Sequence, residues 1–107
     1  MATIVSPGAK QENRDQQEPL YDLVLLDDAE HTYDYVIEML EKLFALSTAD
    51  AWNRAVEVDT TGRTIVITCE LPAAEFGRDQ IHAFGADWRM PSSKGSMSAI
   101  VQPCGHL

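Results

Sequence analysis

Two adjacent aspartates, Asp27 and Asp28, follow a mostly apolar run at residues 20–26 and open the segment DDAEHT. Ionised carboxylates only accept hydrogen bonds and carry negative charge, so a pair of them suits a positively charged ligand group. The alternative is a solvated acidic turn, in which Asp occurs because its side chain hydrogen-bonds the neighbouring backbone. The residues themselves leave both interpretations open.

Glu30 and His31 extend this segment with groups of the kinds that bind metal ions. Oxygen ligands suit Mg²⁺ or Ca²⁺, but the segment lacks the ligand spacing and the glycine of an EF-hand, and a zinc site would need further His or Cys nearby. We therefore expect no metal and no other cofactor, and keep an acidic cation-binding site as an alternative. Because the sequence has neither a GxSxG motif nor a P-loop, we also predict that the protein is not an enzyme.

Three aromatic residues, Tyr33, Tyr35 and Trp52, lie where helices are expected to begin. Aromatic side chains in such places commonly cover the hydrophobic core. Tyr33, two positions after His31, could instead flank a pocket beside the acidic turn. Both interpretations stay open at this point.

Hydrophobic periodicity places the acidic turn between a strand and a helix. Residues 20–26 are predicted as a buried strand, and Thr32 as the N-cap of a helix at about 33–45. Ser47 resembles the first residue of a capping box and begins a second helix at about 48–58. The later elements are a turn at 60–63, a β-branched strand at 64–69, a helix at 73–84 that follows Pro72 and stops at Gly85, a loop at 86–95, and a strand at 98–102.

The length of 107 residues fits one domain, and the order strand, helix, helix, strand, helix, strand predicts a small two-layer α/β sandwich. Residues 1–19 have no hydrophobic period and are predicted to form a disordered arm, and residues 103–107 a tail. A net charge of −9 argues against nucleic acid and anionic membranes as partners. With no 18-residue apolar run and no signal-like start, we expect a cytoplasmic protein.

The segments LYDLVLLDDAEHTYDYVIEMLEKLF, AVEVDTTGRTIVIT and AAEFGRDQIHAFG, in this order and spacing, resemble the ClpS-type adaptors of the Clp AAA+ protease. The patterns HTYDYVIEML, VDTTGR and SKGSMSA are similar to the planctomycete branch. The resemblance covers residues 20–102 and implies a ClpS-like fold, with a three-stranded antiparallel sheet and three helices. It also implies an adaptor that binds the free α-amino group and the large hydrophobic side chain of N-terminal residues (N-degrons), and delivers these substrates to a Clp AAA+ protease.

ClpS adaptors usually carry Asn-Asp-Asp after the first strand and a His at the end of the second helix, and these groups hold the α-amino group of the substrate. The matching positions here are Asp27, Asp28 and Ala29 for the triplet, and Asp59 for the His. The resemblance thus implies that Asp27, Asp28 and Asp59 bind the ammonium group. An ammonium offers three N–H donors and a positive charge, which suits three carboxylates.

The resemblance also implies a side-chain pocket beside the ammonium site. Its matching positions are His31, Tyr33, Val36, Met39, Ala55, Val58 and Met97, with Ser96 as a further candidate. Tyr33 and Ala55 stand where relatives often have Met, so the pocket is expected to have a different shape.

Docking to the N-domain of a Clp AAA+ unfoldase is the partner interaction that the resemblance implies. The surface positions that relatives use correspond to Glu30, Pro72 and Gly77, and none keeps the common Tyr, Glu or Lys. This chain therefore docks in a different way or binds N-termini without efficient delivery. A docking module of the same fold without N-terminal peptide binding is the alternative function. We expect a monomer.

Overall fold

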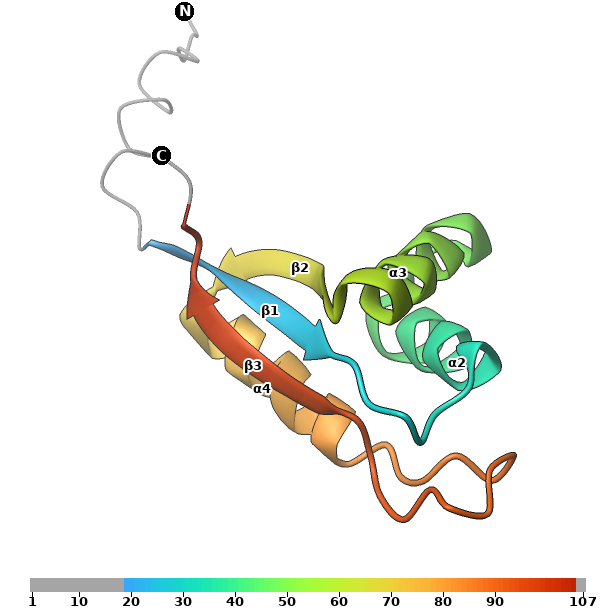
Figure 1. The fold of residues 1–107 in the computed structure, drawn as a ribbon. Coiled ribbons are helices and arrows are strands. Elements are labelled where there is room, and N and C mark those ends of the chain that lie inside the picture. Colours follow the sequence, from blue (N-terminus) through green and yellow to red (C-terminus); the bar gives the residue numbers. More distant parts are fainter. Residues whose placement is uncertain (1–18, 106–107) are drawn as a thin grey trace, which may run out of the picture.

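The computed structural model describes residues 19–105, which form the predicted order of elements (Figure 1). The elements are β1 (Leu20–Leu26), α2 (Tyr33–Phe44), α3 (Thr48–Thr61), β2 (Arg63–Glu70), α4 (Leu71–His82) and β3 (Ser98–Pro103). The sheet has the order β2-β1-β3 with both pairings antiparallel, so the predicted fold class is confirmed. The arm predicted at residues 1–19 lies, apart from Pro19, outside the described residues. None of the described helices has the length and apolar character needed to cross a membrane.

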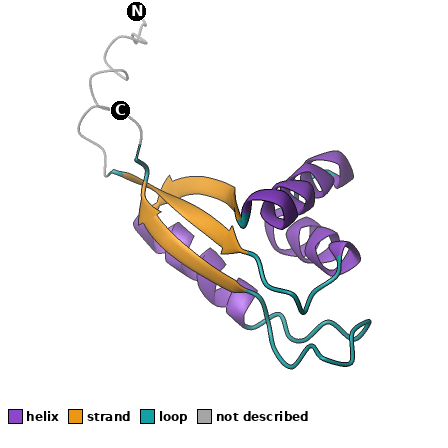
Figure 2. Ribbon diagram, in the orientation of Figure 1, coloured by secondary structure: helices purple, strands orange, loops and turns teal. Residues whose placement is uncertain are grey.

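The central strand β1 carries the core. Leu23 and Leu25, which alternate along the strand, are fully buried in one cluster with the inward side chains of the helices. The opposite face of the sheet carries no helix (Figure 2). There Val24 pairs with the partly exposed Ile65 and Ile100 on the two outer strands. The fold therefore has two layers, and the helical layer is where a cavity can form.

Both predicted N-caps are confirmed by side-chain hydrogen bonds. Thr32 accepts a hydrogen bond from the backbone N–H of Tyr35 at 3.1 Å, and Ser47 accepts one from that of Asp50 at 3.0 Å. The caps fix where α2 and α3 begin, and the α2 cap stands directly after the acidic turn.

The end of α3 differs from the prediction, because the helix continues to Thr61 instead of ending at residue 58. Thr60 and Thr61 are helical rather than part of the predicted turn, and their hydroxyls hydrogen-bond the Val56 and Glu57 carbonyls one turn back. Gly62 ends the helix with φ +91°, a conformation that favours glycine, and its N–H donates to the Val58 carbonyl at 3.0 Å. Asp59 thus lies in the last turn of α3.

Helix α4 spans Leu71–His82, whereas the sequence predicts 73–84. Pro72 stands in its first turn, where the missing N–H is harmless. The predicted stop at Gly85 is wrong, because the Ala83 N–H already bonds back to Asp79 and Gln80 and the chain leaves the helix there.

Gly77 in α4 is buried, so the expectation that it marks a surface position for docking is wrong. A Cβ atom at this position would lie 2.7 Å from Leu23 Cδ2 and 3.0 Å from Phe44 Cε1. The missing side chain lets α4 pack directly against the central strand and α2. Glu30 and Pro72, in contrast, are exposed.

We predict that Gly77→Ala destabilises the protein. Ala gains about 1 kcal/mol of helix propensity over Gly, but overpacking of a core typically costs about 1–3 kcal/mol. We expect urea unfolding to show a free energy of unfolding lower by about 1 kcal/mol, because the added Cβ would force the buried Leu23 side chain or the Phe44 ring to shift. The control is Gly95→Ala, whose Cβ meets nothing within 4 Å. A stabilised Gly77→Ala protein would contradict the close packing.

Candidate functional site

A cavity of about 200 Å³ lies where the end of β1, the start of α2 and the end of α3 meet. All predicted site residues line it except Met39 and the further candidate Ser96. Met39 is fully buried in the core cluster, one helical turn after Val36. Ala29 and Thr32 line the cavity as well, although the sequence did not single them out for the pocket. The full set is Asp27, Asp28, Ala29, His31, Thr32, Tyr33, Val36, Ala55, Val58, Asp59 and Met97.

One backbone hydrogen bond explains why carboxylates from distant parts of the chain share this cavity. The N–H of Asp27 donates to the carbonyl of Gly62 at 3.0 Å. Gly62 is the residue that ends α3, and Asp59 stands in the turn just before it. The end of β1 is therefore fastened to the end of α3, and Asp27 and Asp28 come to line the same wall as Asp59.

The carboxylates make the cavity strongly acidic. Burial raises the pKa of Asp27, a backbone hydrogen bond from Asp28 opposes this, and the negative charges of Asp59 and Asp28 raise the pKa further. Like charges held this close disfavour one another, so a bound positive charge would relieve the repulsion. The arrangement suits a cationic group better than a neutral or anionic one.

Tyr33 forms one side of the cavity. Its hydroxyl donates to Asp59 Oδ2 at 2.7 Å, and its ring lies against that of Trp52 with 5.3 Å between centroids. The hydrogen bond to the Asp59 carboxylate raises the pKa of Tyr33. Of the two open interpretations, Tyr33 flanks a pocket, whereas Tyr35 is buried in the core.

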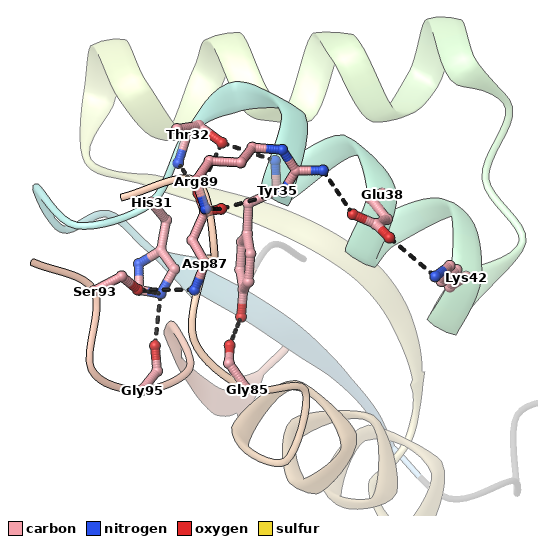
Figure 3. Close-up of polar contacts among 10 residues, drawn as sticks. All are labelled: His31, Thr32, Tyr35, Glu38, Lys42, Gly85, Asp87, Arg89, Ser93 and Gly95. Carbon is pink, nitrogen blue, oxygen red and sulfur yellow. Dashed lines mark hydrogen bonds and ion pairs between the residues drawn. The ribbon is translucent and has the colours of Figure 1, made fainter. Parts of the chain in front are cut away.

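His31 lines the cavity with its ring nitrogens already engaged. Nδ1 lies 2.7 Å from Asp28 Oδ1, and Nε2 lies 2.7 Å from the Gly95 carbonyl and 3.3 Å from Ser93 Oγ. Figure 3 shows the ring pointing towards the loop of residues 83–97, which joins α4 to β3. The imidazole thus connects an acidic wall residue to a loop remote in sequence.

Sequence reasoning missed Asp87 in this loop. It is 1% exposed, and its Oδ2 accepts hydrogen bonds from the Thr32 N–H and hydroxyl, both at 2.7 Å (Figure 3). Its Oδ1 accepts from the backbone and guanidinium of Arg89, which also binds Glu38. Burial tends to raise the pKa of Asp87, but the bonds from Thr32 and Arg89 outweigh it and lower the pKa to about 2. Among these contacts, only the bond from the Arg89 backbone N–H, two residues along the chain, follows a local pattern that a sequence can indicate.

Within residues 19–105, no three His, Cys, Asp or Glu side chains are arranged to hold a metal ion. This holds for the carboxylates that line the cavity as well.

The fold and the cavity define a small β-α-α-β-α-β domain with an acidic pocket at one end of its helical layer. The family model described as ATP-dependent Clp protease adaptor protein ClpS matches residues 16–91, and the chain belongs to this family. The solved structure of Agrobacterium tumefaciens ClpS2 bound to L-phenylalaninamide is similar in fold, with a TM-score of 0.70 and 20% identity over 81% of this chain and 99% of that chain. A comparison with curated proteins gives no match. The resemblance to ClpS adaptors is confirmed.

We predict that the stabilising effect of Asp87 disappears in acid. Its pKa in the folded protein, about 2, lies below the ordinary value of 3.8, so its contribution is present above about pH 4 and is lost as the pH falls towards 2. At pH 6, Asp87→Asn should lower the free energy of unfolding by about 2 kcal/mol, and at pH 2.5 by much less. Urea unfolding at both pH values measures this.

The matched control is Asp79→Asn, which changes an exposed carboxylate on α4. It should have little effect at either pH. An Asp87→Asn effect that is the same at pH 6 and pH 2.5 would show that the carboxylate is not held by these hydrogen bonds.

Proposed function

We propose that the cavity binds the N-terminal residue of a protein or peptide, and that the chain is a non-enzymatic, cytoplasmic adaptor for a Clp AAA+ protease. One observation carries the proposal: Asp27, Asp28 and Asp59 come from two separate segments and line one cavity, to which Val36, Ala55, Val58 and Met97 contribute apolar side chains. A free α-amino group, with a pKa near 8, is an ammonium at neutral pH. Its charge and N–H donors complement these carboxylates.

The apolar wall receives the first side chain of the substrate. Val36, Ala55, Val58 and Met97 supply this wall, and all four are buried. Because apolar surface of this kind gains free energy by covering a hydrophobic side chain, large hydrophobic first residues fit the pocket. The ligand of Agrobacterium ClpS2, L-phenylalaninamide, has a free α-amino group and an aromatic side chain, which is consistent with the proposal.

Acetylation of the N-terminus separates this function from unspecific apolar binding. An acetylated amine is neutral, has a single N–H and is bulkier, so the carboxylates would be left without their counter-charge. Isothermal titration of short peptides that begin with Phe, Leu, Val or Ala, each with and without acetylation, tests the proposal. Equal affinity for the free and acetylated forms would refute it.

We predict that Asp28→Ala abolishes most of the peptide binding. Loss of a partner in a desolvated charge-assisted hydrogen bond typically costs at least about 2 kcal/mol, or about thirtyfold in affinity. Asp34→Ala is the matched control, because Asp34 is an exposed carboxylate on α2 that does not line the cavity. It should bind the peptide as the unchanged protein does.

The same variant separates recognition from delivery. Asp28→Ala should still bind an unfoldase N-domain, since Asp28 belongs to the peptide cavity. A protein that binds the N-domain but no free N-terminal peptide would instead be a docking module of the same fold.

We predict that Ala55→Val shifts the preference for the first residue. Two added methyl groups on the cavity wall reduce the room for a side chain, and poor fit in an apolar pocket costs about 1–3 kcal/mol. Peptides that begin with Phe should therefore weaken more than tenfold relative to those that begin with Ala. Thermal unfolding of the variant checks that the fold is kept. An unchanged Phe-to-Ala affinity ratio would mean that the first side chain does not contact Ala55.

A further inference from the structure

We propose that His31 is a positioning residue, which holds the Asp28 carboxylate in the orientation that an ammonium group requires. This role is distinct from lining the side-chain pocket, which is the role that the resemblance implies for His31. Its consequence for ligand affinity rests on the proposed function. The orientation of Asp28 itself does not, and it can be measured without a ligand.

The two hydrogen-bond partners, His31 and Asp28, differ in exposure. The His31 side chain is 3% exposed, whereas that of Asp28 is 35% exposed. The 2.7 Å contact therefore joins a buried ring to an accessible carboxylate. Asp28 Oδ1 also accepts the Glu30 N–H at 2.9 Å, so this oxygen is occupied twice from the protein side.

Both ring nitrogens of His31 contact the protein itself, so neither is left for a ligand. The Gly95 carbonyl and an ionised carboxylate are both acceptors only, so a doubly protonated ring satisfies both contacts. A ring with a single proton on Nδ1 still donates to Asp28 and accepts from the Ser93 hydroxyl at 3.3 Å. The bond to Asp28 is therefore made whenever Nδ1 carries a proton, in the doubly protonated ring and in the neutral Nδ1–H tautomer.

The loop that carries Gly95, the contact of His31 Nε2, is itself held in place. Gly95 belongs to the loop 83–97, which Asp87 ties to Thr32, the residue next to His31. The acidic segment is thus held at two consecutive positions by one loop (Figure 3). Tyr35, whose ring lies 4.5 Å from the imidazole, closes the remaining side of His31.

A fixed orientation of the Asp28 carboxylate affects the affinity for a ligand. Without the ring, Asp28 would keep only the weaker restraint of the Glu30 N–H, and a ligand that needs one rotamer would have to stop the remaining side-chain motion at a cost in affinity. A carboxylate that is already held binds without that cost. We therefore infer that the loop, although it contributes little to the cavity wall, contributes to ammonium binding through His31.

Two substitutions at the same position separate the two contacts of the ring. In His31→Asn the side-chain amide can replace Nδ1 and still donate to Asp28, but it does not reach Gly95. In His31→Gln the longer side chain can replace Nε2 and reach the loop, but it does not donate a hydrogen bond to Asp28. Both variants lose the ring and differ from each other by one methylene group, and thermal unfolding verifies that both fold.

The ligand-free readout is the set of NMR three-bond couplings of the Asp28 β-protons, which report its χ1 rotamer. We expect one rotamer in the unchanged protein and in His31→Asn, and averaging in His31→Gln. A single Asp28 rotamer in His31→Gln overturns the positioning role, whatever the peptide affinities are.

The second readout is the affinity for a peptide with a free N-terminal Phe. Because loss of a charge-assisted hydrogen bond is expected to weaken preorganisation, His31→Gln should bind on the order of tenfold more weakly than His31→Asn. Equal affinities, or tighter binding by His31→Gln, would overturn the link to ligand binding. Absence of peptide binding by the unchanged protein would refute the proposed function alone, since the couplings still decide the role of His31.

Discussion

The hydrogen bond from the Asp27 N–H to the Gly62 carbonyl is the constraint on which the site depends. It joins the end of the central strand to the end of α3, and it exists because Gly62 adopts a left-handed conformation that other residues reach only with strain. Without it, Asp27 and Asp28 would form an ordinary acidic turn and Asp59 an ordinary helix end. With it, three carboxylates and the apolar side chains between α2 and α3 surround one cavity.

This concentration of negative charge works against folding rather than for it. The raised pKa of Asp27 records the burial and the repulsion from its neighbours. Hydrogen bonds within the protein offset part of this electrostatic cost. The Tyr33 hydroxyl bonds Asp59, and the His31 ring bonds Asp28. Sites that accept a local cost of this kind are typically those where a ligand provides the missing counter-charge.

Local chemistry is what the sequence predicts well. Thr32 and Ser47 were identifiable as caps because a capping side chain bonds the backbone three residues away. The end of α3 was missed because two threonines before a glycine are typical of a turn, whereas the helix here continues to Thr61 and ends at Gly62, whose N–H bonds back to Val58.

Contacts between distant segments are what the sequence does not predict. Asp87 is separated by 55 positions from Thr32, its main partner, so no local pattern indicates it. Val36 and Met39 share a helix face at a spacing of one turn, and periodicity cannot tell that the first borders a cavity and the second fills the core. Position 77 shows the same limit, because alignment to the family assigns it to a surface that the packing of Leu23 and Phe44 rules out.

The imidazole and the carboxylates of the cavity stand at other positions than in the pattern that the resemblance implies. The resemblance places a His where this chain has Asp59, and Asn-Asp-Asp where it has Asp27, Asp28 and Ala29. His31, which precedes α2 and lines the cavity, contacts both Asp28 and the Gly95 carbonyl of the loop. An imidazole whose nitrogens are engaged by Asp28 and Gly95 can orient a carboxylate, so under the proposed function recognition of the amine would fall to the carboxylates. Under the proposed function the loop 83–97 would contribute to binding, since it holds the ring that contacts Asp28.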